Sequence, residues 1–165
     1  MPPDDGPALA AYEAFASAYD AFTADHDYES WTATLERVAC EHRLTGQRLL
    51  DVACGTGKSF LPHLPRGYRV VACDLSPAMA AIARAKAPGT RVLVCDMRRL
   101  PVLGAFDWVT CLDDALNYLL EEDDLAAAFG SAARNLRRGG LYVFDLNTLR
   151  AYRETFGADA CSDRD

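Results

Sequence analysis

The 165-residue chain is short of positive charge. It has 17 Lys and Arg against 24 Asp and Glu, which gives a net charge of −7. Nucleic-acid affinity rests largely on Lys and Arg, so this balance argues against phosphate-backbone binding, and we expect no nucleic-acid partner. The length suits one domain with its own core.

Long apolar runs and an export signal are also missing from the sequence. No run of roughly 18 apolar residues occurs, so we expect neither a membrane span nor a membrane partner. The first residues, MPPDDGP, have neither the cationic nor the apolar segment of a signal peptide. A cytoplasmic location is the resulting expectation.

The cysteines lack the spacing of a metal site or a disulfide framework. No two of them form a C-x2-C or C-x4-C pair. Four lie at or near the ends of successive apolar runs, as small buried thiols in strands would. We therefore expect reduced core thiols and no metal. The cysteines are Cys40, Cys54, Cys73, Cys95, Cys111 and Cys161.

Hydrophobic spacing divides the chain into a helical part and an alternating part. Residues 1–7, with their prolines among acids, predict a disordered lead-in. Residues 8–46 predict N-terminal helices, with a break around Asp25 and Asp27. Strands and helices then alternate over residues 47–157, and residues 158–165 predict a flexible polar tail.

The alternating part predicts a doubly wound, mostly parallel, Rossmann-like α/β sheet, in which the strand ends gather at one edge. The predicted strands are Arg48–Ala53, Arg69–Asp74, Arg91–Cys95, Phe106–Cys111 and Leu141–Leu146. The predicted helices follow Gly57, run from Ser76-Pro77 to Lys86, run from Glu122 to Leu136, and run from Thr148 to about Phe156. The segment Arg137-Arg138-Gly139-Gly140 is expected to end the third of these helices.

The most informative local motif is DVACGTGK, from Asp51 to Lys58. It follows the short apolar run 48–50 at the start of the first predicted strand, and Asp74 ends the second strand 23 residues after Asp51. An acid, a glycine-rich turn, a helix, a strand and a second acid together predict a βαβ nucleoside-binding unit.

Two common cofactor motifs fit this segment poorly. The GKS ending at residues 57–59 matches a P-loop, but Val52 stands where the first glycine is required, and the loop is too short for a triphosphate. Gly55 and Gly57 begin a GxGxxG fingerprint, but its third glycine is replaced by Phe60. A bulky side chain there opposes the packing that pyrophosphate binding uses, which leaves a nicotinamide-dependent reductase as a weaker alternative.

The motif, taken with further segments, resembles the class I S-adenosylmethionine-dependent methyltransferases. The family motif is an acid followed by GxGxG, and here Ala53 replaces the first glycine. The N-terminal YDAFTADHDYESW is similar to that of the glycine N-methyltransferase group and of bacterial metabolite-modifying relatives. The other matching segments are VVACDLSPAMAAIARA (70–85), VCDMRRLP (94–101), FDWVTCLDDALNYL (106–119) and LRRGGLYVFDLN (136–147).

This resemblance implies S-adenosylmethionine as cofactor, S-adenosylhomocysteine as product, N-terminal helices that act as a lid, and a small-molecule acceptor methylated on nitrogen or oxygen. Asp74 would accept both ribose hydroxyls, a task that suits a carboxylate. Asp96 would take the adenine amino group, with Met97 near the ring. Asp51 would orient the ammonium end of the cofactor, and Tyr19 would contact its carboxylate end.

Small residues complete the implied cofactor site. Gly55 and Gly57 would let the backbone approach the cofactor without a Cβ clash. Ala53 and Leu112 would offer backbone contacts to its amino-acid part. The full implied set is Tyr19, Asp51, Ala53, Cys54, Gly55, Gly57, Asp74, Leu75, Asp96, Met97, Cys111 and Leu112.

No residue pattern identifies a catalytic base. Asp113, Asp114 and Asn117 face the expected acceptor region, although helix capping accounts equally well for the two acids. The two C-terminal strands of the family, strands 6 and 7, have no counterpart in the sequence. The fifth strand would then be an exposed edge, which a homo-oligomer could cover. A catalytically idle cofactor-binding fragment is therefore a further alternative.

Overall fold

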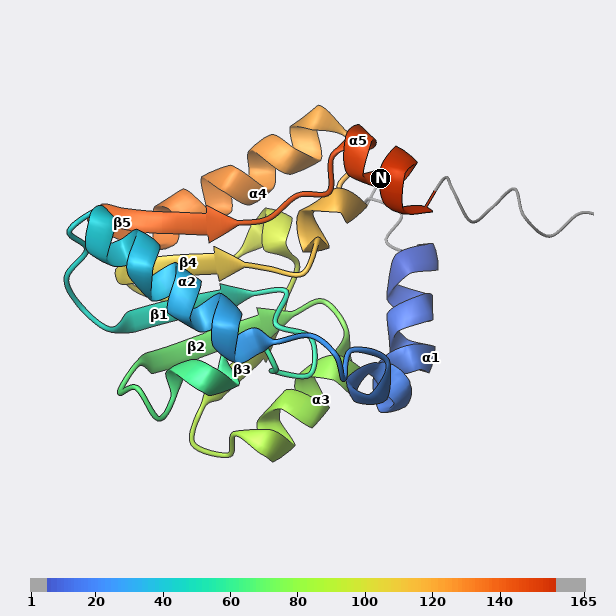
Figure 1. Cartoon of the computed structure of the whole chain (residues 1–165), viewed down its shortest axis with the longest axis horizontal. Helices are drawn as coiled ribbons and strands as arrows, with labels where there is room; N and C mark the ends of the chain where they lie inside the picture. Colours follow the sequence, from blue (N-terminus) through green and yellow to red (C-terminus); the bar gives the residue numbers. More distant parts are fainter. Residues whose placement is uncertain (1–5, 157–165) are drawn as a thin grey trace, which may run out of the picture.

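A computed structural model describes residues 6–156, and its centre is one parallel sheet of five strands (Figure 1). The strand order is β3-β2-β1-β4-β5. The first three strands are therefore added toward one edge of the sheet and the last two toward the other, so the strand order reverses between β1 and β4. The predicted doubly wound parallel sheet is confirmed. The strands are β1 (Arg48–Val52), β2 (Arg69–Asp74), β3 (Arg91–Val94), β4 (Phe106–Cys111) and β5 (Leu136–Phe144).

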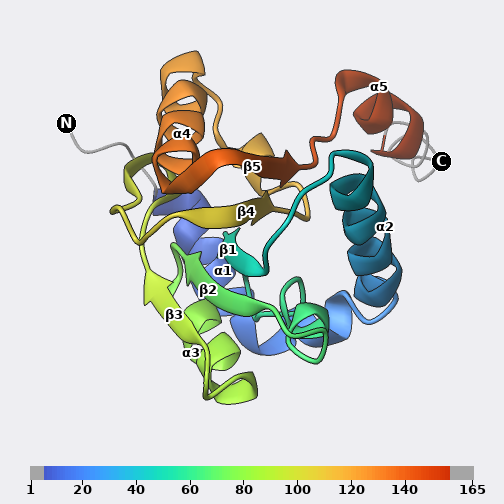
Figure 2. The same cartoon turned by 90° about the vertical axis from the view of Figure 1, so that its left-hand side faces the viewer.

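The helices surround the sheet on both faces and at one edge. Figure 2 shows α2 and α4 on opposite sides of the sheet, and Figure 1 shows α1 beyond the carboxyl ends of the strands. The elements are α1 (Gly6–Phe22), α2 (Tyr28–Glu41), α3 (Pro77–Lys86), α4 (Glu122–Asn135) and α5 (Leu149–Ala151), with short turns η1 (Leu61–His63), η2 (Met97–Arg99), η3 (Ala115–Tyr118) and η4 (Tyr152–Phe156). None of the described helices is long and apolar enough to cross a membrane.

Two helix starts follow the capping signals in the sequence. Asp27 caps α2 by accepting a hydrogen bond from the Ser30 N–H, which explains the predicted break between α1 and α2. Ser76 caps α3 by accepting from the Met79 N–H at 3.1 Å, and Pro77 occupies the first turn as predicted.

The sheet has an apolar core on each face. One core packs residues of α2 and α3 against the strands, with Leu49, Phe60 and Trp108 at its centre. The other packs α4 against the opposite face, around Leu50 and Val109. All five of these side chains are at most 2% exposed, so the sheet that carries the loops is rigidly packed.

The predicted helix after Gly57 is wrong. The chain there makes consecutive turns and then only the short η1. A Cβ on Gly57 would lie 3.0 Å from the Phe60 ring, so this ring fills the space beside the glycine. Pro62 and Pro65 follow, and proline lacks the N–H group that an interior helix position must donate. The segment therefore cannot extend into a regular helix.

The predicted boundary between α4 and β5 is also wrong. β5 begins at Leu136, so Arg137-Arg138-Gly139-Gly140 belongs to the strand and does not end a helix. The pairing of β4 with β5 is irregular here, because Phe106 pairs with Leu136 whereas Trp108 pairs with Leu141. A Cβ on Gly140 would lie 2.9 Å from the Asp107 carbonyl oxygen, so the glycine permits the close approach of this bulge.

The chain ends differ from the predicted domain ranges in one respect. Helix α1 begins at Gly6, so Gly6 and Pro7, expected in the disordered lead-in, are helical. Residues 1–5 and the predicted tail, residues 158–165, lie outside the described residues.

Candidate functional site

A cavity of about 520 Å³ lies between α1 and the carboxyl ends of the strands. It opens beside β1 and β4, where the strand order reverses, which is the usual ligand position in open α/β sheets. Nine of the implied cofactor residues line it, namely Tyr19, Ala53, Cys54, Gly55, Asp74, Leu75, Asp96, Met97 and Leu112. The other three, Asp51, Gly57 and Cys111, lie behind this lining.

The glycine-rich loop forms the floor of the cavity. Ala53 (φ +57°) and Gly55 (φ +52°) both have left-handed backbone conformations. A Cβ on Gly55 would have only the Tyr19 ring within 4 Å, at 3.8 Å, so this glycine faces the cavity. Gly57 instead packs against the protein interior, beside Phe60.

Asp51 fixes the loop from below. Its side chain is 1% exposed, and it accepts hydrogen bonds from Ser59 Oγ at 2.5 Å and Thr110 Oγ1 at 2.6 Å. Burial raises the pKa of the Asp51 carboxyl to about 6. Asp51 thus ties the loop to β4, and any contact with a ligand would have to pass through the loop.

Asp74 presents its carboxylate to the cavity from the end of β2. Its two oxygens accept hydrogen bonds from the Gly55 N–H and the Ser76 N–H, each at 2.8 Å. Burial raises the pKa of this carboxyl. A carboxylate has about four acceptor positions, so Asp74 retains capacity for two hydroxyl groups of a ligand.

The loop after β3 carries a charged network that the sequence did not reveal. Asp96 accepts hydrogen bonds from the Arg98 N–H at 2.8 Å and from Arg98 Nε at 2.9 Å. Arg98, a residue only 9% exposed, also donates through its guanidinium to Asp124 at 3.0 Å. Asp96 is therefore held rigidly at the cavity wall, next to Met97.

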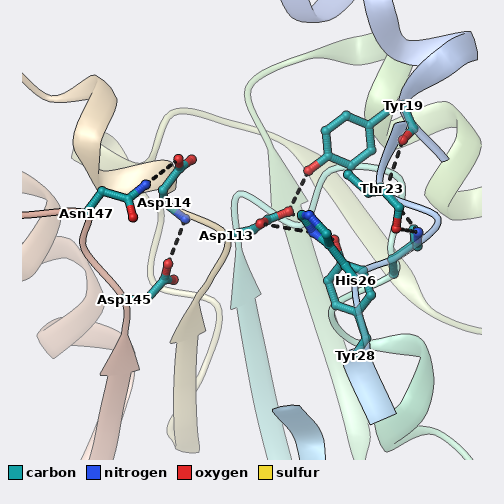
Figure 3. Close-up of polar contacts among 9 residues, drawn as sticks. Tyr19, Thr23, His26, Tyr28, Asp113, Asp114, Asp145 and Asn147 are labelled. Atoms are coloured by element: carbon teal, nitrogen blue, oxygen red, sulfur yellow. Dashed lines mark hydrogen bonds and ion pairs between the residues drawn. The ribbon is translucent and has the colours of Figure 1, made fainter. Parts of the chain in front are cut away.

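Four tyrosine hydroxyls lie along another side of the cavity. Tyr19 from α1 and Tyr28 from α2 both donate to Asp113 Oδ2, at 2.8 and 2.9 Å (Figure 3). Burial, and then the negative charge of Asp113, raise the pKa of both phenols. Tyr12 donates to Tyr118 Oη at 2.7 Å. Tyr12 was missed, although it lies two helical turns before Tyr19 and so on the same face of α1.

Lys58, the lysine of the GKS segment, binds the protein itself. Its Nζ donates to the Thr23 carbonyl oxygen at 2.5 Å and to Thr23 Oγ1 at 2.9 Å, just past the end of α1. It also lies 5.1 Å from the centre of the Tyr28 ring. Thr56 donates to Asp20 of the same helix at 2.6 Å. The loop therefore fastens α1 above the cavity.

Of the three polar residues expected at the acceptor region, only Asp113 lines the cavity. Asp114 accepts from Asn147 Nδ2 at 2.8 Å, and Asn117 exchanges hydrogen bonds with the Asn147 backbone at 2.9 and 3.0 Å. Figure 3 shows Asp113 and Asp114 turned in opposite directions. Asp114 and Asn117 thus anchor the segment after β5.

The described part of the chain offers no metal-binding group of His, Cys, Asp and Glu side chains. Its five cysteines are free thiols, and Cys161 lies outside the described residues.

The donor set of the cavity fits a nucleoside without phosphate groups. Asp74 suits a ribose, while Leu75, Met97 and Leu112 offer apolar walls for a base. The two cations of the lining, Lys58 and Arg98, are bound by protein groups, and five carboxylates line the same cavity. This charge pattern disfavours a pyrophosphate and tolerates a cationic ligand.

Comparisons with known proteins agree with this chemistry. Residues 49–140 match a family model described as a methyltransferase domain. A protein of Geobacillus sp. (strain WCH70) that is named as a methyltransferase is 35% identical over 142 residues, which cover 83% of this chain and 58% of the relative.

Two solved structures are similar over most of the chain. An S-adenosylmethionine-dependent methyltransferase from Clostridium acetobutylicum ATCC 824 has a TM-score of 0.75 and 32% identity, covering 87% of this chain and 59% of that one. An S-adenosylmethionine-bound amino pentose methyltransferase from Micromonospora echinaspora has a TM-score of 0.72 and 31% identity, covering 82% and 56%. The chain therefore spans somewhat more than half the length of these relatives.

Proposed function

We propose that this chain, which belongs to the class I S-adenosylmethionine-dependent methyltransferase family, transfers a methyl group to an amine of a small molecule. When bound, S-adenosylmethionine supplies a methyl group on a positively charged sulfur. The protein's task is to hold the acceptor nitrogen in line with that methyl group and to exclude water.

One observation carries the proposal for the cofactor. The Asp74 carboxylate faces the cavity and is fixed by two backbone N–H groups, one of them from Gly55 in the glycine-rich loop. Asp74 would hold the ribose, Met97 and Leu75 would flank the adenine, and Tyr19 would lie at the amino-acid end. Asp51 would act indirectly, by holding the loop in place.

The charges of the cavity favour an amine over a hydroxyl acceptor. Five carboxylates and two protein-bound cations line it, so it attracts cations and repels anions. Asp113 lies where the acceptor would enter, and His26 Nδ1 is 3.5 Å from its Oδ1. An ammonium acceptor must lose a proton to free its lone pair, and these groups could receive it. The similar solved structure from Micromonospora echinaspora is named as an amino pentose methyltransferase, which adds support for an amine acceptor.

Titration calorimetry tests the cofactor. We expect S-adenosylhomocysteine to bind, whereas NAD and ATP should not; binding of NAD or ATP in its place would refute the proposal.

The acceptor is tested by transfer of a labelled methyl group to amino sugars and to matched sugars in which a hydroxyl replaces the amine. Transfer to the hydroxyl sugars alone would refute the proposal that the acceptor is an amine. Cofactor binding without transfer to either set would favour the idle fragment.

A further inference from the structure

We propose that Asp113 is a positioning residue for the cofactor site, because it joins both N-terminal helices to the cavity wall through Tyr19 and Tyr28. This inference rests on the proposed function in that the cavity is taken to hold S-adenosylmethionine. It assigns Asp113 a role distinct from the helix capping that the sequence allowed and from proton acceptance.

One carboxylate gathers side chains from three consecutive parts of the N-terminal region. Tyr19 from α1 and Tyr28 from α2 donate to the same oxygen, Oδ2, at 2.8 and 2.9 Å. His26, in the connection between the two helices, places Nδ1 3.5 Å from Oδ1. Figure 3 shows the three side chains converging on Asp113.

The other polar attachments of α1 do not hydrogen-bond to α2. Glu13 binds Ser76 and the Ala78 N–H at the start of α3. Thr56 binds Asp20 in α1, and Lys58 binds Thr23 just past its end while lying 5.1 Å from the centre of the Tyr28 ring. Among the described contacts, Asp113 is the group on the sheet edge that accepts a hydrogen bond from each of the two helices.

The Tyr19 ring links this junction to the cofactor loop. Its hydroxyl is held by Asp113, and its Cε1 lies 3.8 Å from the position that a Cβ on Gly55 would take. Tyr19 therefore spans the cavity from the loop after β4 to the loop after β1. Without Asp113 the ring would lose its fixed end, and α1 would be freer to leave the glycine-rich loop.

The neighbouring residue offers a matched control. Asp114 has the same carboxylate, follows the same strand, and has the same left-handed backbone, with φ +56° against +65° for Asp113. Its side chain accepts a hydrogen bond from Asn147, and among the described residues no hydrogen bond joins it to either N-terminal helix. Replacing either acid by Asn removes one negative charge, and in both variants the new side chain stands on a left-handed backbone.

The first experiment measures S-adenosylhomocysteine binding by calorimetry. Hydrogen bonds to a carboxylate are about twice as strong as those to a neutral amide, so Asp113→Asn should weaken binding about tenfold or more. Asp114→Asn should change it less than about threefold. Equal losses in the two variants would overturn the proposal. A lower melting temperature for Asp113→Asn, with unchanged affinity well below it, would also overturn it, since that is a purely structural role.

A double-mutant cycle separates positioning from a direct contact. If Asp113 acts through Tyr19, then Tyr19→Phe and Asp113→Asn should not add, and the double variant should bind about as weakly as the weaker single variant. Fully additive losses would show that Asp113 does not act through the tyrosine.

A second readout does not depend on any ligand. Trp31 packs beside Tyr28 and His26, with ring centres 5.0 and 5.8 Å apart, and Trp108 is the other tryptophan of the chain. In a Trp108→Phe background, acrylamide should quench Trp31 more strongly after Asp113→Asn than after Asp114→Asn. Unchanged quenching would show that Asp113 does not hold the helices.

The two readouts distinguish the inference from the proposed function. If the unaltered chain does not bind S-adenosylhomocysteine, the proposed function fails, and with it the cofactor part of the inference, whatever the quenching shows. If the unaltered chain binds S-adenosylhomocysteine, and the Asp113→Asn variant has the same affinity and the same quenching as the unaltered chain, the inference alone fails.

Discussion

Two buried titratable groups should affect the pH dependence of stability in opposite directions. His63 of η1 is 1% exposed, packs against the Tyr68 and Trp108 rings, and has no partner for Nδ1 among the described residues. Burial lowers the pKa of His63 to about 4, whereas burial raises the pKa of Asp51 to about 6. Two variants test this prediction. His63→Leu removes the titrating imidazole, and Asp51→Asn removes the titrating carboxyl.

The sign of each contribution follows from proton uptake. Between about pH 4 and 6.5 the unfolded chain protonates His63 and the folded chain does not, so this residue makes stability rise with pH. Over about pH 4 to 6 the folded chain protonates Asp51 and the unfolded chain does not, so stability falls as pH rises. With about 1.4 kcal/mol for each pKa unit, each effect amounts to about 3 kcal/mol. In the unaltered chain the two contributions therefore nearly cancel.

Urea unfolding at a series of pH values from 4 to 7 tests this cancellation. Relative to the unaltered chain, Asp51→Asn should make the free energy of unfolding rise more steeply with pH, by about 1 kcal/mol per unit near pH 5. His63→Leu should make it rise less steeply by a similar amount. Other carboxylates contribute equally in all three chains, so only differences in slope matter. Parallel curves, or changes of the same sign, would refute the reasoning.

Three further substitutions test particular contacts, and a fourth serves as a control. Asp74→Ala should reduce S-adenosylhomocysteine affinity at least a hundredfold by calorimetry, through loss of the ribose contacts; unchanged affinity would refute the placement of the ribose. Gly57→Ala should cost about 2 kcal/mol in urea unfolding, because φ is +91° and the Phe60 ring leaves only 3.0 Å for a Cβ. Gly140→Ala should cost about 2 kcal/mol through the 2.9 Å clash with the Asp107 carbonyl. Gly89→Ala, where a Cβ meets open space, should be nearly neutral, and an equal loss there would contradict the bulge explanation.

Local signals predicted the fold where a short-range rule decides the structure. The Ser76-Pro77 start of α3 and the break before α2 at Asp27 follow from capping, which depends on neighbouring residues. The alternation of strand and helix patterns along the chain predicted the parallel sheet, because crossover connections between successive strands make those strands parallel. The family resemblance gave nine residues that the structure does bring together around one cavity.

The errors arose where a distant partner decides the local structure. Gly139 and Gly140 had the pattern of a helix stop, but Gly140 lies in the irregular pairing of β4 with β5, where it closely approaches Asp107, which is far away in the sequence. Asp113 and Asp114 were indistinguishable as adjacent acids. Only tertiary contacts show that one meets Tyr19 and the other Asn147.

The turns after Gly57 have an electrostatic consequence. A regular helix starting at that point would direct roughly half a positive charge from its amino terminus into the cavity. η1 is too short to build such a dipole, and the Phe60 ring and the following prolines prevent its extension. The glycine-rich loop therefore adds no helix dipole of its own to the cavity, whose lining already includes the N-terminal residues of α3 and α4. A helix dipole at this point would favour a phosphate over a cationic sulfonium.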